Sequence, residues 1–224
     1  EAAVRVRDET LGIVSHDLRN PLTKIALSAD LLSGATADDA ELVETIRSSA
    51  RQMQRLIADL LDVAQMESGS LSVAHDELDP APLVAEMCES NRTIAEQKEQ
   101  RIECRLEPEL PSICGDRDRL EQVFGNLISN SIKFTPVGGV ISVSARRKAD
   151  VVEFAVHDSG PGIPESDLHH IFTAYWQAKK TAHLGAGLGL ALARWIARVH
   201  GGDVALAASS RLGSTFVISL PAPE

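Results

Sequence analysis

The segment from Leu42 to Val63 reads LVETIRSSARQMQRLIADLLDV, and its mostly apolar stripe recurs at alternating steps of three and four residues. This spacing is typical of a helix in a coiled coil or a four-helix bundle, where the buried stripe is narrow. The stripe consists of Leu42, Ile46, Ser49, Met53, Leu56, Leu60 and Val63. The sequence therefore predicts a long helix that packs against other helices.

A second stripe of the same kind precedes this segment. Its members are Leu11, Val14, Leu18, Leu22, Ile25, Ala29 and Leu32. Only the short break at residues 33–36 separates the two stripes, so we expect an antiparallel helical hairpin. One hairpin leaves its stripe uncovered on one side. We therefore expect two chains to form a homodimer through a four-helix bundle.

The pattern changes after Gly69, a glycine of the kind that ends helices. Short runs rich in β-branched residues now alternate with helical stretches. The expected strands are Ile102–Leu106, Val140–Ala145, Val151–His157 and Phe216–Leu220, and the expected helices lie around 82–98, 117–134 and 187–200. The sequence thus predicts a helical hairpin domain at 1–69 and an α/β domain at 70–224, whose size is usual for one domain.

Composition limits the classes of function. The net charge of −10 argues against a nucleic-acid partner, because such a protein needs a basic face to neutralise phosphates. No apolar run is long enough to span a bilayer. The sequence begins at Glu1 and its first methionine is Met53, so we expect a cytoplasmic piece of a longer protein, with any membrane anchor in the missing segments.

The three cysteines, Cys88, Cys104 and Cys114, include no C-x-x-C pair. This spacing favours reduced thiols in a cytosolic protein over a disulfide or a zinc site.

His16 lies midway between the stripe residues Val14 and Leu18, so it should project from the helix into solvent. Position alone makes it an ordinary surface histidine. However, Asp17 follows it directly, and Asn20 lies one helical turn further on the same face. A neutral imidazole is a nucleophile, and the adjacent carboxylate can accept its proton while the amide places a water.

The predicted α/β domain contains a polar cluster on one helix face, at Asn126, Asn130 and Lys133. Carboxamide oxygens can bind Mg²⁺, and an ammonium group can contact phosphate. A merely solvated helix face would explain this cluster equally well when it is considered alone.

Two glycine-rich segments follow. Asp158-Ser-Gly160-Pro-Gly162-Ile163 comes after an expected strand, and Gly185-Ala-Gly187-Leu188-Gly189-Leu opens an expected helix. Glycines permit close backbone approach, and amides at a helix N-terminus form a cradle for anions. Alone, the first segment could be a surface turn, and the second could serve close packing.

The segment Ser15–Leu22, SHDLRNPL, resembles the phosphoacceptor box of the sensor histidine kinases. The three later clusters, in this order, resemble the ATP-binding domain of the same family, which belongs to a superfamily with gyrase and heat-shock chaperone ATPases. The resemblance implies a mixed sheet covered by one layer of helices, with a lid over the nucleotide. Residues 171–177 resemble the aromatic segment before that lid, and 178–184 would form the lid.

This resemblance implies a role for each matching residue. His16 would be the phosphoacceptor, Asp17 its base, and Asn20 the residue that positions water in phosphatase action. Asp158 would accept a hydrogen bond from the adenine amino group, and Asn130, with Asn126, would hold Mg²⁺. Lys133 would contact the phosphates of ATP. The other nucleotide-site positions are Phe134, Gly160, Gly162, Ile163, Gly185, Gly187, Leu188 and Gly189.

Asn126 also distinguishes the branches of that superfamily. The resemblance places it where ATP-hydrolysing members carry a glutamate that activates water, and an amide cannot act as a base. We therefore expect autophosphorylation of His16 and phosphotransfer to an aspartate of a response regulator, under control of an upstream sensor domain. Two alternatives stay open: a protein that acts mainly as a phosphatase, and a degenerate kinase that serves as a dimeric scaffold.

Overall fold

The computed structural model describes residues 18, 21–29, 31–32, 37–69, 72–178 and 186–222. They fall into two compact units. The helical unit comprises Glu1–Ser70 and Thr173–Leu188, and the α/β unit comprises Leu71–Phe172 and Gly189–Glu224. Part of the glycine-rich segment that the sequence assigns to the nucleotide site thus belongs to the helical unit.

The predicted long helix is confirmed as α2 (Ala37–Ser68), which ends where the sequence indicates. Gly69 follows with a φ of 64°, the left-handed conformation that glycine adopts most readily after a helix. Residues 21–29 are also helical, as the first stripe predicts, whereas the expected connection at 33–36 lies outside the described residues. Among the helices that the structure describes, none is long and apolar enough to cross a membrane.

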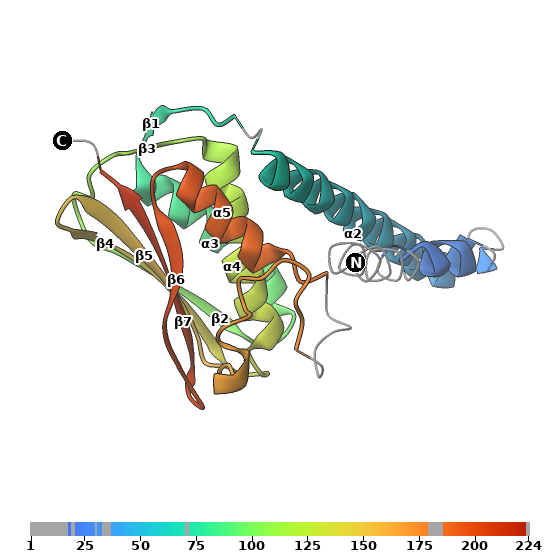
Figure 1. The fold of residues 1–224 in the computed structure, drawn as a ribbon. Coiled ribbons are helices and arrows are strands. Elements are labelled where there is room, and N and C mark those ends of the chain that lie inside the picture. The colour runs from blue at the N-terminus through green and yellow to red at the C-terminus, as the bar shows by residue number, and fades with distance from the viewer. Residues whose placement is uncertain are drawn as a thin grey trace. The chain divides into compact units, whose positions relative to one another are not determined.

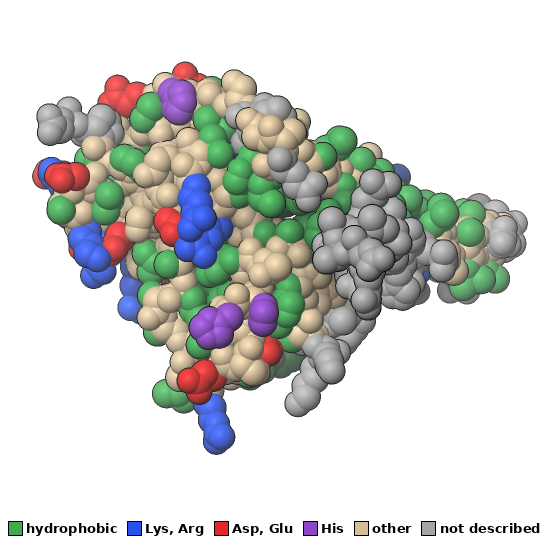
Figure 2. Space-filling view, in the orientation of Figure 1, with side chains coloured by type: hydrophobic (Ala, Val, Ile, Leu, Met, Phe, Trp, Pro, Cys, Tyr) green, Lys and Arg blue, Asp and Glu red, His purple; other side chains and the backbone are tan. Residues whose placement is uncertain are grey.

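The helical unit keeps many large apolar side chains in water. Ser49 and Val63 of the predicted stripe are buried, but Leu22 is 54% exposed. Leu61, outside the stripe, is 62% exposed, and Figure 2 shows hydrophobic side chains at the surface of this unit. The exposed set is Leu22, Leu27, Leu31, Leu32, Ile57 and Leu61. One chain therefore leaves several of its apolar helix side chains uncovered.

A mixed sheet organises the α/β unit, as the resemblance implies, and it has five strands in the order β2-β4-β5-β7-β6. Strands β2 and β4 are parallel, and all other neighbours are antiparallel. The strands are β2 (Arg101–Leu106), β4 (Val140–Lys148), β5 (Val151–Asp158), β6 (Asp203–Ser210) and β7 (Gly213–Pro221). A separate two-stranded sheet joins β1 (Asp76–Leu78) to β3 (Ile113–Gly115).

Three helices cover one face of the five-stranded sheet: α3 (Pro80–Glu96), α4 (Arg117–Phe134) and α5 (Gly189–Val199) (Figure 1). Residues of β5 alternate strictly between buried and half-buried, because successive side chains point to opposite faces of a strand. The rings of Phe124 on α4 and Phe154 on β5 meet edge to face, with centroids 5.1 Å apart. The core of this unit thus lies between the sheet and its helices.

The sequence did not indicate three of the strands. β6 contains alanines and serines, which have weak strand preference, and it forms because it pairs along its length with β7. Strands β1 and β3 have three residues each, too few for a periodic pattern. A short 3₁₀ helix, η1 (Glu165–Asp167), follows the glycine turn after β5.

Specific hydrogen bonds hold both ends of α4. At its start, the Asp116 carboxylate accepts a hydrogen bond from the backbone N–H of Arg119 and another from that of Ala74. At its end, the buried Gln100 amide donates to the carbonyl oxygens of Ile132 and Thr135 at 3.0 and 2.5 Å, which a helix C-terminus otherwise leaves unpaired. These contacts fix the helix that carries the predicted polar cluster.

His200 secures the same helix start from the end of α5. Its Nε2 accepts a hydrogen bond from the Asp116 backbone N–H at 3.0 Å, and its Nδ1 lies 2.8 Å from the carbonyl oxygen of Ile196. The first contact requires an unprotonated Nε2, so Nδ1 carries the hydrogen and donates it. A Cβ at Gly115 would lie 2.8 Å from this ring, so glycine gives the imidazole its space.

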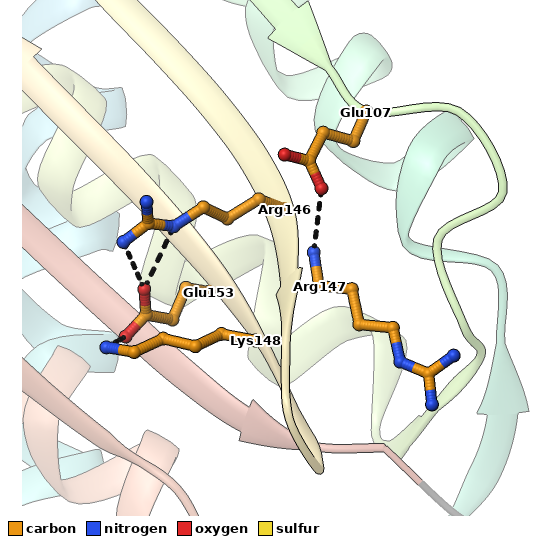
Figure 3. Close-up of polar contacts among 5 residues, drawn as sticks. All are labelled: Glu107, Arg146, Arg147, Lys148 and Glu153. Carbon is orange, nitrogen blue, oxygen red and sulfur yellow. Dashed lines mark hydrogen bonds and ion pairs between the residues drawn. The ribbon is translucent and has the colours of Figure 1, made fainter.

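The β4–β5 hairpin carries three consecutive basic residues, two of which share one acidic partner (Figure 3). Glu153, whose side chain is 12% exposed, accepts hydrogen bonds from Arg146 and Lys148, both at 2.7 Å. Its pKa is lowered, chiefly by the bond from Lys148. Arg147 points to the other face, and its backbone N–H donates to Glu107 at 3.1 Å. Glu153 therefore balances one of the three positive charges of the hairpin.

We predict that His200→Leu lowers the free energy of unfolding by about 1–3 kcal/mol, because it leaves the backbone N–H of Asp116 without a partner in a site of similar volume. Urea unfolding followed by circular dichroism measures the change. His169→Leu, at an exposed histidine, is the matched control and should change stability by less than about 0.5 kcal/mol. Equal stability of the two variants would show that the His200 contacts do not hold α4.

Candidate functional site

Asp158, the last residue of β5, is a charged residue inside the α/β unit. It is 5% exposed, and its Oδ1 accepts a hydrogen bond from the Gly160 backbone N–H at 2.9 Å. Burial raises the pKa of this carboxyl group, while the backbone N–H groups of Gly160 and Ser214 act in the opposite direction. A carboxylate kept in such surroundings is suited to accept a further hydrogen bond from a ligand that also excludes water.

Two glycines near this residue allow close approaches between backbone segments. Gly213 has a φ of 129°, and a Cβ there would lie 1.8 Å from the carbonyl oxygen of Asp158. Gly162 has a φ of 74°, and its Cβ would lie 1.9 Å from the carbonyl oxygen of Ser210. No larger residue fits either position without moving the backbone. The predicted turn after β5 therefore has a fixed backbone conformation at the edge of the site.

The polar cluster on α4 is partly shielded from solvent. Asn126, Asn130 and Lys133 are all half-buried. Burial lowers the pKa of Lys133, and its Nζ lies 4.7 Å from the centroid of the Phe134 ring, a distance at which an ammonium group interacts with an aromatic face. A partly desolvated cation at this end of the helix can contact an anionic ligand more strongly than one fully in water.

Within the α/β unit, α4 brings the predicted clusters together. A Cβ at Gly160 would lie 3.0 Å from the carbonyl oxygen of Phe134, so the turn after β5 packs against the end of α4. A Cβ at Gly189, the first residue of α5, would lie 3.4 Å from Asn126 Oδ1. The turn after β5 and the start of α5 thus both pack against one helix.

Asn126 supplies a test of whether the site suits a ligand. Its Nδ2 is buried and has no hydrogen-bond partner among the residues that the structure describes. A buried amide without a partner is uncommon and costs stability. Because the two ends of a carboxamide can be exchanged by rotation, this side chain can offer a bound group either a donor or an oxygen ligand. The donor set of Asn126 and Asn130 therefore fits a phosphate with its cation.

Other predicted site residues belong to the helical unit or lie outside the described residues. Gly187 has a φ of 71°, and its carbonyl oxygen accepts a hydrogen bond from the Tyr175 backbone N–H at 3.0 Å. Leu188 is buried, and Ile163, in the α/β unit, is held through its backbone N–H by Ser209 Oγ at 2.7 Å. The residues for which the structure gives no description are His16, Asp17, Asn20 and Gly185.

Sequence reasoning missed the contribution of β6 and β7 to the site. Ser209 anchors the turn after β5, and Ser214 supplies one of the backbone hydrogen bonds to Asp158. Gly213 permits the close approach described above. These residues lie about fifty positions after Asp158 and form no recognisable local motif. The pairing of β5 with β7, which aligns Asp158 with Ser214, brings them to the site.

Two family models match most of the chain. Residues 6–69 match the model described as the His Kinase A (phospho-acceptor) domain. Residues 115–224 match the model described as histidine kinase-, DNA gyrase B-, and HSP90-like ATPase. The first contains His16, Asp17 and Asn20, and the second contains the polar and glycine clusters.

Known proteins are similar to this chain over both of the matched regions. The chain is 32% identical to the adaptive-response sensory kinase SasA of Synechococcus elongatus, over 96% of this chain and 59% of that protein. It is 34% identical to the aerobic respiration control sensor protein ArcB of Escherichia coli, over 100% of this chain and 30% of that protein. A crystal structure of full-length ShkA in complex with AMPPNP matches with a TM-score of 0.73 at 28% identity, covering 96% of this chain and 46% of that one. The chain thus spans at most about three-fifths of these proteins.

We predict that Asp158→Asn leaves the free energy of unfolding at pH 7 unchanged or raises it, because the folded state no longer buries a charge. The raised pKa means that the folded protein binds the proton more tightly than the unfolded chain does. The free energy of unfolding of the wild type should therefore rise relative to that of the variant as the pH falls through the folded-state pKa. Urea unfolding across the acidic range measures the difference.

Asp203→Asn is the matched control of opposite sign. Arg194 and Arg198 hydrogen-bond to Asp203, and the first of these bonds is the main reason that its pKa falls to about 2. This carboxylate stabilises the fold above its unfolded-state pKa, and the contribution is lost as the pH falls towards 2. Its replacement should therefore destabilise the protein at pH 7. A comparable loss for Asp158→Asn would mean that Asp158 is a structural residue.

Proposed function

The chain belongs to the sensor histidine kinases, and we propose that it transfers the γ-phosphoryl group of ATP to His16 and then to an aspartate of a response regulator. The observation that carries this proposal is the buried Asp158 carboxylate, walled by glycines and joined to α4 by the close approach of Gly160 to Phe134. Such a group costs stability, and recognition of a ligand explains why the fold keeps it.

We assign residues of α4 and its neighbours to different parts of the nucleotide. Asp158 accepts a hydrogen bond from the adenine amino group, and Lys133 contacts the phosphates. Asn130 and Asn126 provide oxygen ligands for Mg²⁺, which, when bound, neutralises charge that develops on the phosphates. The cradle is completed by Phe134, Gly160, Gly162, Ile163, Gly185, Gly187, Leu188 and Gly189.

His16 and Asp17 supply the chemistry of the transfer. One nitrogen of the neutral imidazole attacks the γ-phosphorus, the bond to the bridging oxygen breaks, and ADP leaves. Asp17 accepts the proton from the other ring nitrogen, so the phosphorylated ring stays neutral. Asn126, which has no basic group, does not activate water in competition with the histidine. Asn20 positions the water that removes the phosphate from the regulator by hydrolysis.

We propose that the working form is a homodimer joined through the helical unit, with residues 1–69 as the dimerisation and phosphotransfer domain and 70–224 as the ATP-binding domain. The exposed leucines Leu22, Leu27 and Leu61 support this arrangement, because a second hairpin would remove them from water. Family membership supports a response-regulator receiver domain as partner. An upstream sensor domain in the remaining part of a longer chain would control the activity.

The proposal predicts where phosphate appears. After incubation with γ-labelled ATP and Mg²⁺, the wild-type chain should carry label that is stable in alkali and lost in acid, as expected for phosphohistidine. His16→Gln should reduce this label to background while nucleotide affinity stays unchanged, since the residue acts as acceptor only. His169→Gln is the matched control and should label normally. Persistent label in His16→Gln would show that another residue is the acceptor.

A further inference from the structure

Two of the three cysteines meet inside the α/β unit, although their positions in sequence gave no sign of it. Cys88 lies on α3 and is 1% exposed, and Cys104 lies on β2 and is exposed. The proximity of Cys104 is one cause that raises the pKa of Cys88, so the two thiols are neighbours. Both are free in this structure. A buried thiol and an accessible thiol therefore lie close together.

The strand geometry explains the contact. Cys104 alternates with Ile102 and Leu106, so all three side chains lie on the same face of β2. Ile102 is buried, which identifies this as the face covered by helices. Helix α3 packs directly on β2. Because β2 is an edge strand, with β4 on only one side, Cys104 can lie on the helix-facing side of the sheet and still be exposed at the open edge.

The two thiols have different surroundings, which suit different steps of one reaction. Burial is the main cause that raises the pKa of Cys88 to about 12, followed by the proximity of Cys104. Arg92, one helical turn from Cys88, acts in the opposite direction, and Glu89, its ion-pair partner at 2.8 Å, raises the pKa further. Cys88 therefore stays a protonated thiol, protected from direct attack by an oxidant in water.

We propose that Cys88 and Cys104 are a reversible oxidation site, at which a peroxide converts the two thiols into a disulfide that joins α3 to β2. The site is independent of the proposed phosphotransfer, because neither cysteine belongs to the nucleotide or phosphoacceptor residues. Two thiols alone do not form a metal centre, and the described residues hold no group of three or more His, Cys, Asp or Glu that could bind one.

The chemistry balances with hydrogen peroxide as the oxidant. The Cys104 thiolate attacks one oxygen, the O–O bond breaks, and hydroxide leaves, which gives a sulfenic acid on Cys104. The Cys88 sulfur then attacks the Cys104 sulfur, the S–O bond breaks, and the departing hydroxide takes the Cys88 proton as water. Two thiols lose two electrons, and the peroxide becomes two waters. A dithiol reductant reverses the change.

The contact determines what oxidation does to this protein. A neighbouring thiol traps the sulfenic acid before a second peroxide can carry it to the irreversible sulfinic state. The S–S bond of about 2.05 Å requires the sulfurs to approach further, and an edge strand can move to allow it. The bond closes a loop that contains the end of α3, so the oxidised form should resist unfolding more than the reduced form.

The test uses the full chain, first reduced, then freed of reductant and treated with hydrogen peroxide. After alkylation and digestion with trypsin, the three cysteines fall in separate peptides, 56–92, 102–105 and 106–117. We expect a linked pair of 56–92 with 102–105, a mass lower by about 2 Da, recovery with dithiothreitol, and an alkylated Cys114. The melting temperature of the oxidised form should be higher by roughly 5 °C or more.

Matched variants separate this site from general oxidation. Cys114→Ser, at the cysteine on β3, should form the same linked pair as the wild type. Cys104→Ser should form none and keep its melting temperature after peroxide. Cys88→Ala should instead gain about 32 Da on the 102–105 peptide as the sulfinic acid. Sulfinic acid on Cys104 of the wild type, or linkage only between chains, would overturn the proposal.

Discussion

The burial of one carboxyl group, that of Asp158, is the constraint on which the α/β unit depends. Burial raises its pKa, so a charge at this position opposes folding unless other groups compensate. Backbone N–H groups of Gly160 and Ser214 compensate in part, and Gly213 allows β7 to approach closely enough to provide one of them. The register of β5 with β7 aligns Ser214 with Asp158, and Gly160 in the turn after β5 packs against the end of α4. A fold selected for stability alone would place an uncharged residue here.

The sequence was sufficient wherever a local pattern determines the structure. The three-four spacing predicted α2 to within a few residues, and β-branched runs predicted β2, β4, β5 and β7. The sequence did not predict the features that depend on tertiary pairing. β6 has weak strand preference and forms against β7, and the role of Ser214 depends on its register with Asp158. The contact of Cys88 with Cys104 joins a helix to a strand, so residue spacing could not reveal it.

The sequence predicted which residues form the candidate site, but it did not show that they lie close together. Each cluster had a plain structural explanation when considered alone, and only their order along the chain favoured a nucleotide site. The structure adds that Gly160 approaches the end of α4 and Gly189 approaches Asn126. Gln100 and His200 hold the ends of that helix. Helix α4 is thus held at both ends. Groups from distant parts of the sequence lie along it and could contact one ligand.

The central claim is that Asp158 recognises the amino group of adenine. The most direct measurement is the ratio of dissociation constants for ITP and ATP, because the two nucleotides differ in the group at purine C6: a carbonyl oxygen that cannot donate, or an amino group that can. The wild type should bind ITP roughly 10- to 100-fold more weakly, as expected for one lost charge-assisted hydrogen bond. In Asp158→Asn the ratio should approach one, because a carboxamide can donate to the carbonyl. An equal affinity of the wild type for both nucleotides, or a ratio unchanged in the variant, would contradict the account.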